Sequence, residues 1–206
     1  MYVPKLFRLD DWPTIRQFIH QNSFAVLISH HEGKPWGTHL PLEITVNESG
    51  EKVLWGHLSR ANPQWRSFES NPLVMAIFQG PHSYVSSSWY NHLNVPTWNY
   101  IAVHIYGTVK IMEEEKLYES LKLLVNRYEK VAKNPMDVET MPQEFVRREM
   151  KGIVGMEIAI EKIEGKWKLS QNRGDEDYRN IIQELEQLSD LNSKLVAGEM
   201  KKMRTD

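Results

Sequence analysis

Apolar residues alternate with polar ones along much of the first two-thirds of the chain, as they do in strands that bury one face. The longest alternation spans residues 99–111, where every second position from Ile101 onward is apolar or glycine. Its other face carries Tyr100, His104 and Tyr106. Further strands are predicted over residues 24–29, 38–46, 52–58, 73–79, 154–163 and 167–169. The pattern predicts a protein built mainly from strands.

Helical spacing interrupts this pattern. In one such stretch Ile15, Phe18 and Ile19 fall on one face, which indicates a helix on the surface of a core. Beyond Asp175 an apolar seam predicts a single C-terminal helix. Helices are expected over residues 11–21, 62–69, 113–133, 141–150 and beyond 175. Strands with helices inserted between them favour a closed or partly closed antiparallel β-barrel, an α+β fold, over a doubly wound sheet.

The charge balance bears on the partners of the protein. The 206 residues include 25 Lys and Arg against 27 Asp and Glu, a formal net charge of -2. This balance lacks the basic surface that supplies most non-specific affinity for nucleic acid. Direct DNA binding is therefore not supported by charge, although the basic cluster at residues 201–204 could make a few salt-sensitive phosphate contacts.

Several kinds of chemistry are excluded by the residues present. The chain has no cysteine, which excludes disulfides and thiolate catalysis. Its eight histidines lack the His-x-x-x-His spacing of a metal site, and the Gly-x-Ser-x-Gly, Walker and Rossmann motifs are absent. No stretch approaches the roughly 20 apolar residues of a membrane span, and the first residues do not form a signal sequence. We expect a cytoplasmic protein without a metal or a membrane association.

Uncommon strings of Trp, His and Pro occur along most of the chain. They are Met1-Tyr2-Val3-Pro4, Thr38-His39-Leu40-Pro41, GHLSRANPQW at 56–65, FQGPH at 78–82, VPTWNY at 95–100, Val103-His104, Ile153-Val154-Gly155 and GKWKLSQNR at 165–173. With these strings the chain resembles the PaiB family of FMN-binding negative transcriptional regulators. It departs from the family after Arg173, where Gly174-Asp175-Glu176-Asp177 replaces the more basic continuation expected there.

The resemblance implies a six-stranded antiparallel FMN-binding split barrel, related to the pyridoxamine-phosphate oxidases, in which two subunits build flavin sites at their interface. We therefore expect FMN as the cofactor, a homodimer, a flavin-binding barrel over residues 1–173, and a C-terminal helix and tail over residues 174–206. The family also implies repression of protease production and sporulation in a spore-forming bacterium. A flavin-dependent oxidoreductase that acts on an unknown small molecule is the alternative, and no catalytic residue can be named.

The first predicted cofactor-binding set lies where a strand meets a short helix, and comprises His57, Ser59, Arg60 and Asn62. A guanidinium binds an oxyanion with two parallel hydrogen bonds, and the N–H groups at a helix start also favour phosphate. Spacing alone favours a surface ion pair for Arg60 and a capping role for Asn62. The resemblance instead implies a site for the FMN phosphate.

The second predicted set follows a strand and comprises Lys168, Gln171, Asn172 and Arg173. Amides can satisfy the donor and acceptor positions of a flavin's pyrimidine edge, and a cation stabilises the negative charge that develops near N1 on reduction. Without the resemblance an ordinary charged loop is favoured. Trp98 is added as an aromatic wall and Asn99 as a polar anchor, with simple packing as the alternative for both.

Overall fold

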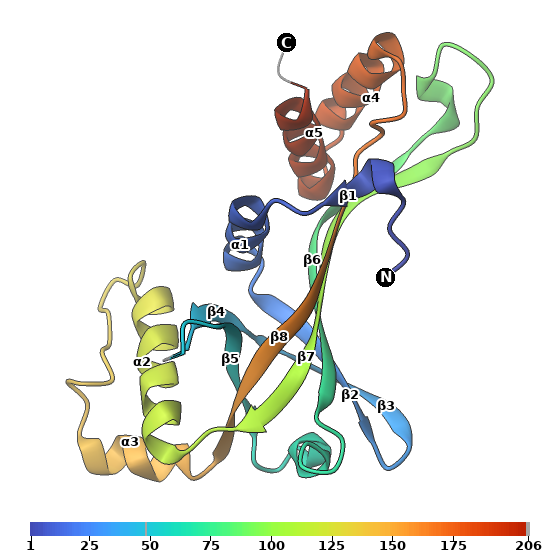
Figure 1. The fold of residues 1–206 in the computed structure, drawn as a ribbon. Helices are drawn as coiled ribbons and strands as arrows, with labels where there is room; N and C mark the ends of the chain where they lie inside the picture. Colours follow the sequence, from blue (N-terminus) through green and yellow to red (C-terminus); the bar gives the residue numbers. More distant parts are fainter. Residues whose placement is uncertain (48, 205–206) are drawn as a thin grey trace. The chain divides into compact units, whose positions relative to one another are not determined.

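The computed structural model describes residues 1–47 and 49–204. Among these residues the strands are β1 (Arg8–Leu9), β2 (Phe24–His31), β3 (Lys34–Pro41), β4 (Glu43–Val46), β5 (Lys52–Ser59), β6 (Leu73–Val85), β7 (Thr97–Ile111) and β8 (Ile153–Lys168). The α-helices are α1 (Trp12–Gln21), α2 (Glu114–Glu129), α3 (Gln143–Met150), α4 (Asp175–Gln187) and α5 (Leu191–Met203). Helices inserted between antiparallel strands confirm the predicted α+β class (Figure 1).

The strands hydrogen-bond in the order β3, β2, β6, β7, β8, β5, β4, and β1 pairs with β8. The predicted count of six strands was wrong. The stretch predicted as one strand over 38–46 divides into β3 and β4, which lie at opposite ends of this order. Pro41 has no N–H to donate to a ladder, and the N–H of Leu42 donates to the carbonyl of Ser23 at 2.9 Å. Strand β1 has only two residues, too few for an alternation to predict it.

The chain divides into two compact units, and each is described by itself. Unit 1 comprises Met1–Phe18, Phe78–His104 and Glu164–Asp206. Unit 2 comprises Ile19–Ile77 and Ile105–Ile163. Strands β6, β7 and β8 each contribute residues to both units.

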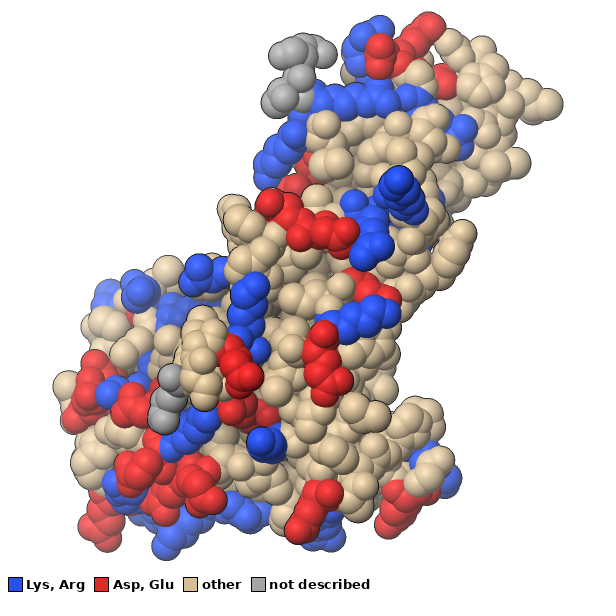
Figure 2. Space-filling model, in the orientation of Figure 1, with Lys and Arg blue, Asp and Glu red and all other residues tan. Residues whose placement is uncertain are grey.

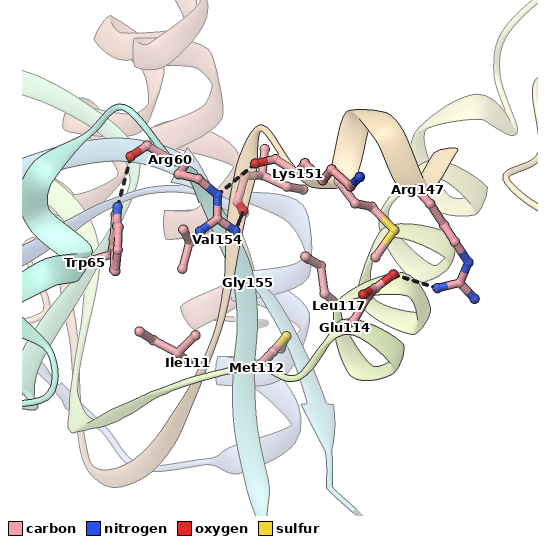
Figure 3. A pocket seen from close by; sticks show the side chains of 12 residues that line it. Arg60, Trp65, Ile111, Met112, Glu114, Leu117, Arg147, Lys151, Val154 and Gly155 are labelled. Atoms are coloured by element: carbon pink, nitrogen blue, oxygen red, sulfur yellow. Dashed lines mark hydrogen bonds and ion pairs between the residues drawn. The ribbon is translucent and has the colours of Figure 1, made fainter. Parts of the chain in front are cut away.

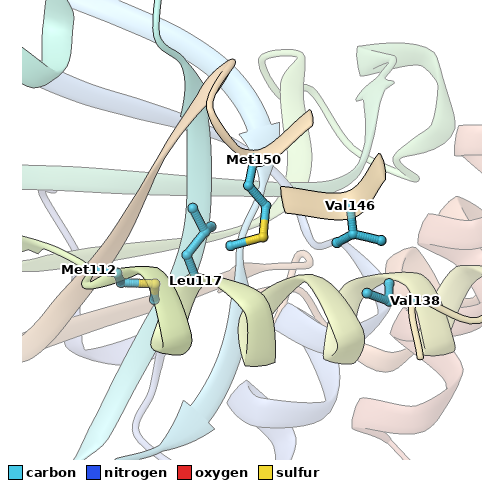
Figure 4. Close-up of a cluster of buried hydrophobic side chains, with 5 residues drawn as sticks. All are labelled: Met112, Leu117, Val138, Val146 and Met150. Carbon is cyan, nitrogen blue, oxygen red and sulfur yellow. The ribbon is translucent and has the colours of Figure 1, made fainter. Parts of the chain in front are cut away.

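Unit 2 contains most of the sheet together with α2 and α3. A cluster of buried side chains packs these two helices together (Figure 4): Met112, Leu117, Val138, Val146 and Met150. Arg147 of α3 also contacts Glu114 and Glu115 in the first turn of α2, at 2.7 and 3.2 Å. Over α2 and α3, Figure 2 shows cationic and anionic side chains intermixed. The two helices therefore form a small packed layer of their own beside the strands.

Unit 1 contains most of α1, up to Phe18, together with α4 and α5. Phe18 of α1 packs edge-on against Trp167, with ring centroids 5.2 Å apart. The C-terminal helix predicted beyond Asp175 is two helices in the structure. Asp190 caps the second of them, α5, by accepting a hydrogen bond from the N–H of Ser193 at 2.9 Å. The hydroxyl of Tyr178 on α4 donates to the carbonyl of Met200 on α5 at 2.7 Å, which joins the two helices. No helix in the described part of the chain is long and apolar enough to cross a membrane.

Candidate functional site

The predicted site residues fall in both units. In unit 2, β5 ends at Ser59 and a short 3-10 helix, η2, spans Pro63–Ser67. Asn62 precedes this helix and caps it, since its Oδ1 accepts from the N–H of Gln64 at 3.1 Å. Its Nδ2 donates to Thr38 Oγ1 at 2.9 Å. Both ends of the Asn62 amide are therefore engaged, and the capping role that spacing favoured is confirmed.

Arg60 holds the turn between α3 and β8. Its backbone N–H donates to the carbonyl of Gly152 at 2.8 Å. Its Nε donates to the carbonyl of Lys151 at 2.7 Å, and its Nη2 to that of Ile153 at 2.8 Å. Within the described residues no carboxylate pairs with Arg60 and its Nη1 makes no hydrogen bond. The guanidinium binds backbone carbonyls instead of forming the surface ion pair, so it keeps its positive charge and a nitrogen that an anion can reach.

A cavity of about 210 Å³ lies beside Arg60 (Figure 3). Trp65 forms one side of it, and the indole N–H of Trp65 donates to the carbonyl of Arg60 at 3.0 Å. The guanidinium carbon of Arg60 lies 6.0 Å from the centroid of that indole. The other lining residues come from β7, α2, α3 and β8 and the turns beside them. This cavity was not predicted, because no local sequence pattern shows that four separate elements meet beside Arg60.

The other two residues of the first set differ in what they offer a ligand. Ser59 is exposed, and its Oγ accepts from the N–H of Ala61 at 3.3 Å, which leaves the hydroxyl hydrogen for a ligand. His57 is half-buried on β5, opposite Gly155 of β8. Burial lowers the pKa of His57 below the ordinary value of 6.5. At neutral pH His57 therefore offers a hydrogen bond but no charge.

Three cations lie near one another in unit 1: Lys166, Lys168 and Arg173. Burial lowers the pKa of Lys168, and the positive charges of Lys166 and Arg173 lower it further. The Nζ of Lys168 donates to Thr97 Oγ1, and to the carbonyl of Trp98 at 2.5 Å. In the described part of unit 1 none of the three cations pairs with a carboxylate. The positive charge of this cluster is therefore not compensated by any carboxylate among the residues that the structure describes.

Arg173 is held against an aromatic ring. Its guanidinium carbon lies 4.9 Å from the ring centroid of Tyr90. Its Nε is buried and has no hydrogen-bond partner among the described residues. A buried charged donor without an acceptor is costly, and a ligand oxygen or nitrogen would remove that cost. The cation cluster thus has the chemistry of a site for an anionic or electronegative ligand.

Two other predicted residues are engaged in the structure of unit 1 itself. Asn99 is fully buried, and its Oδ1 accepts from Ser170 Oγ at 3.0 Å. Gln171 folds back so that its Nε2 donates to the carbonyl of Trp167, and its Oε1 accepts from the N–H of Leu169 at 2.7 Å. These bonds enclose Ser170, whose φ of 61° lies in the left-handed region. Both amides therefore fix the turn that carries the cations.

The remaining two predicted residues are accessible. Asn172 is exposed on the turn after β8. Trp98 is 52% exposed, with its ring centroid 6.3 Å from that of His82 and 5.9 Å from that of Tyr84. These three rings form an aromatic surface at the start of β7. It is available to a planar ligand or to another protein surface.

Lys166 is the cation that sequence analysis missed. It is buried on β8, where its Nζ donates to the carbonyl of Tyr2 at 3.2 Å and lies 5.1 Å from the ring centroid of Tyr100. The sequence did contain a signal that could have identified Lys166. Lys166 and Lys168 are two residues apart on one strand, and such residues share a face.

Comparison with known proteins identifies the family. Residues 1–162 match the model of a family described as "Putative FMN-binding domain", and the chain belongs to this family. The matched range includes the first predicted set and ends before Lys168. The chain is also 42% identical over 197 residues to Protease synthase and sporulation protein PAI 2 of Bacillus subtilis (strain 168), which covers 96% of this chain and 95% of that protein.

Solved structures agree on the fold. A FAD and heme binding protein from Mycobacterium smegmatis superposes with a TM-score of 0.62 at 15% identity, over 84% of this chain and 78% of that chain. The flavocytochrome Anf3 from Azotobacter vinelandii superposes with a TM-score of 0.58 at 16% identity, over 86% of this chain and 78% of that chain. These likenesses confirm the predicted split-barrel fold class.

Proposed function

We propose that this chain is an FMN-binding protein that acts, as a homodimer, as a negative regulator of transcription. The processes it controls would be protease production and sporulation. Support comes from the description of the family, which names FMN, and from the name of the Bacillus subtilis relative, which names protease synthesis and sporulation.

The main structural support for FMN as the cofactor is the positive charge of Lys166, Lys168 and Arg173, which no described carboxylate neutralises. An electronegative ligand would relieve the repulsion among these cations and give the buried Nε of Arg173 an acceptor. FMN fits this chemistry, because it carries a phosphate and a pyrimidine edge rich in acceptors, and when bound it supplies reversible redox chemistry. Lys168 and Arg173 would donate to it, and Trp98 would offer a ring face.

The C-terminal cations favour regulation through the flavin-binding dimer over direct reading of DNA. Lys201 pairs with Glu186 at 2.5 Å and Lys202 with Glu199 at 2.6 Å. Arg204 pairs with Asp175 at 2.7 Å. Each cation of the terminal basic cluster thus has an anionic neighbour, which weakens the attraction of this cluster for a phosphate backbone.

The homodimer is supported by apolar side chains that unit 1 leaves in solvent. Leu93 is fully exposed, Val95 is 69% exposed and Trp98 is 52% exposed, all within one short segment before and at the start of β7. Contiguous exposed apolar side chains are typical of surfaces that pair with another protein. We expect light scattering to give twice the chain mass of 24.2 kDa. A mass of one chain at micromolar concentration would contradict the dimer.

Titration with FMN tests the cofactor. We expect FMN to bind with quenching of its fluorescence, and Arg173→Gln to weaken binding about tenfold or more, as the loss of a charge-assisted hydrogen bond does. Arg179→Gln, on the exposed face of α4, is the matched control and should bind like the parent. Absence of any spectral change with FMN would overturn the proposal. Steady oxidation of NADH or NADPH by the loaded protein, with an added acceptor, would favour the oxidoreductase instead of the regulator.

A further inference from the structure

The cavity beside Arg60 has an apolar floor (Figure 3). Met112, Leu117 and Met150 line it, and these three side chains also belong to the buried cluster between α2 and α3. Trp65 adds an aromatic wall. Methionine side chains adapt their shape and make favourable contacts with aromatic rings. The floor therefore suits a flat apolar group.

Charged residues at this cavity leave a positive excess. Arg147 is neutralised by Glu114 and Glu115, at 2.7 and 3.2 Å. Lys151 also lines the cavity, and within the described residues its ammonium has no hydrogen-bond or ion-pair partner. Among the residues that the structure describes, the Arg60 side chain donates only to backbone carbonyls. Two cations without a counter-charge beside an apolar floor match a ligand with one anionic end and one apolar end.

The size of the cavity narrows the ligand further. A closed apolar cavity of about 150 Å³ holds one benzene molecule, and sites for drug-sized ligands begin near 300 Å³. At about 210 Å³ this cavity has room for one ring with a short acidic substituent, but not for the three fused rings of a flavin. We propose that it binds a small aromatic carboxylate, with the ring against Trp65 and the methionines and the carboxylate at Lys151 and Arg60.

Calorimetric titration of the full chain with phenylacetate tests this site. We expect a dissociation constant of about 0.1–1 mM, which is reasonable for a ligand of this size. Phenylacetamide has the same shape without the charge and should bind at least about tenfold more weakly. Lys151→Gln should weaken phenylacetate binding about tenfold, whereas Lys133→Gln, an exposed lysine that does not line the cavity, should leave it unchanged. Ile111→Trp, at a half-exposed lining position, should fill the cavity and abolish binding.

Three results would overturn the proposal. The first is no phenylacetate binding up to about 10 mM by the folded parent protein, judged against the affinity range above. The second is equal binding by the parent and Lys151→Gln. The third is competition between FMN and phenylacetate for one site, which would assign the cavity to the flavin. Because FMN binding is titrated separately with Arg173→Gln, loss of the carboxylate site leaves the proposed flavin function standing, and the reverse also holds.

Discussion

The Nε–H of Arg60 donates to the carbonyl oxygen of Lys151 at 2.7 Å. This bond joins the end of β5 to the C-terminal end of α3, two segments that are 91 residues apart in the sequence. The carbonyls at a helix C-terminus lack partners within the helix, and a cation placed there also interacts favourably with the helix dipole. Arg60 therefore has a structural role that is independent of any ligand.

Substitution of Arg60 should lower the stability of the protein. We expect Arg60→Gln to reduce the free energy of unfolding by about 1–2 kcal/mol, since two hydrogen bonds from a charged donor are lost at an exposed site. Arg60→Lys should recover only part of the lost free energy of unfolding, because a lysine ammonium cannot place two N–H donors as the planar guanidinium does. Arg66→Gln is the control, since Arg66 is exposed and its guanidinium carbon also lies near the Trp65 ring, 5.8 Å from its centroid. Urea unfolding of the three variants measures the difference, and equal midpoints for Arg60→Gln and Arg66→Gln would contradict it.

The type and approximate extent of long elements could be predicted from the sequence. The alternation over 99–111 corresponds to β7, and the helical spacing over 11–21 to α1. The strand predicted over residues 73–79 is longer in the structure, because β6 continues through Gly80 and Pro81 to Val85. A Cβ at Gly80 would lie 2.5 Å from the ring of Phe18, so this glycine permits a close approach within a strand. Sequence patterns describe one segment at a time, and they do not show which distant ring lies above a glycine.

The sequence showed which side chains of the candidate site could bind a ligand, but it did not show their hydrogen-bond partners within the protein. Arg60 and Lys168 were selected as cations beside strand ends, and the structure leaves both without a carboxylate partner in the described residues. The sequence did not distinguish polar residues that hydrogen-bond within the protein from polar residues that are available to a ligand. Asn99 is an example, because its burial depends on Ser170 and Met200, which are more than 70 residues away.

Protonation of His57 should make the protein less stable in acid. Its pKa is lowered in the folded chain by burial, so the unfolded chain takes up a proton at a higher pH than the folded chain does. The stability that the folded chain gains from neutral His57 is fully present above about pH 6.5. It is lost as the pH falls from there through the pKa that His57 has in the folded chain. We expect urea unfolding between pH 7.5 and pH 5 to show this loss, and His57→Gln to make the dependence shallower. Because burial also lowers the pKa of His104, part of the slope should remain. An unchanged slope in His57→Gln would contradict the assignment, and the exposed His30→Gln is the control.

Two glycines should respond to alanine in opposite directions. A Cβ at Gly107 would lie 2.1 Å from the carbonyl oxygen of Ala159 on the neighbouring strand, a contact that only movement of the backbone can relieve. Gly107→Ala should therefore destabilise the protein by about 3 kcal/mol or more. Gly198 lies within α5 with no atom within 4 Å of an added Cβ, and Gly198→Ala should stabilise by about 0.5–1 kcal/mol. Thermal unfolding of both variants decides the matter, and a Gly107→Ala protein as stable as the parent would refute the close approach of the two strands.

Removal of the Arg173 charge should raise the pKa of Lys168. Burial is the largest cause of the lowered pKa, and the charges of Lys166 and Arg173 add to it. Arg173→Gln removes one of these charges while keeping a polar side chain, so protonation of Lys168 becomes easier. The titration of Lys168 can be followed by NMR of a chain with labelled lysines, and assigned by its loss in Lys168→Gln.

Arg179→Gln is the control and should leave the pKa of Lys168 unchanged, because Arg179 is exposed on α4 and is not among the groups that shift the pKa of Lys168. If Arg173→Gln and Arg179→Gln titrate alike, Arg173 does not act on Lys168, and the three cations do not form one anion site. If only Arg173→Gln shifts, bound FMN should shift Lys168 in the same upward direction, since an electronegative ligand offsets the same repulsion.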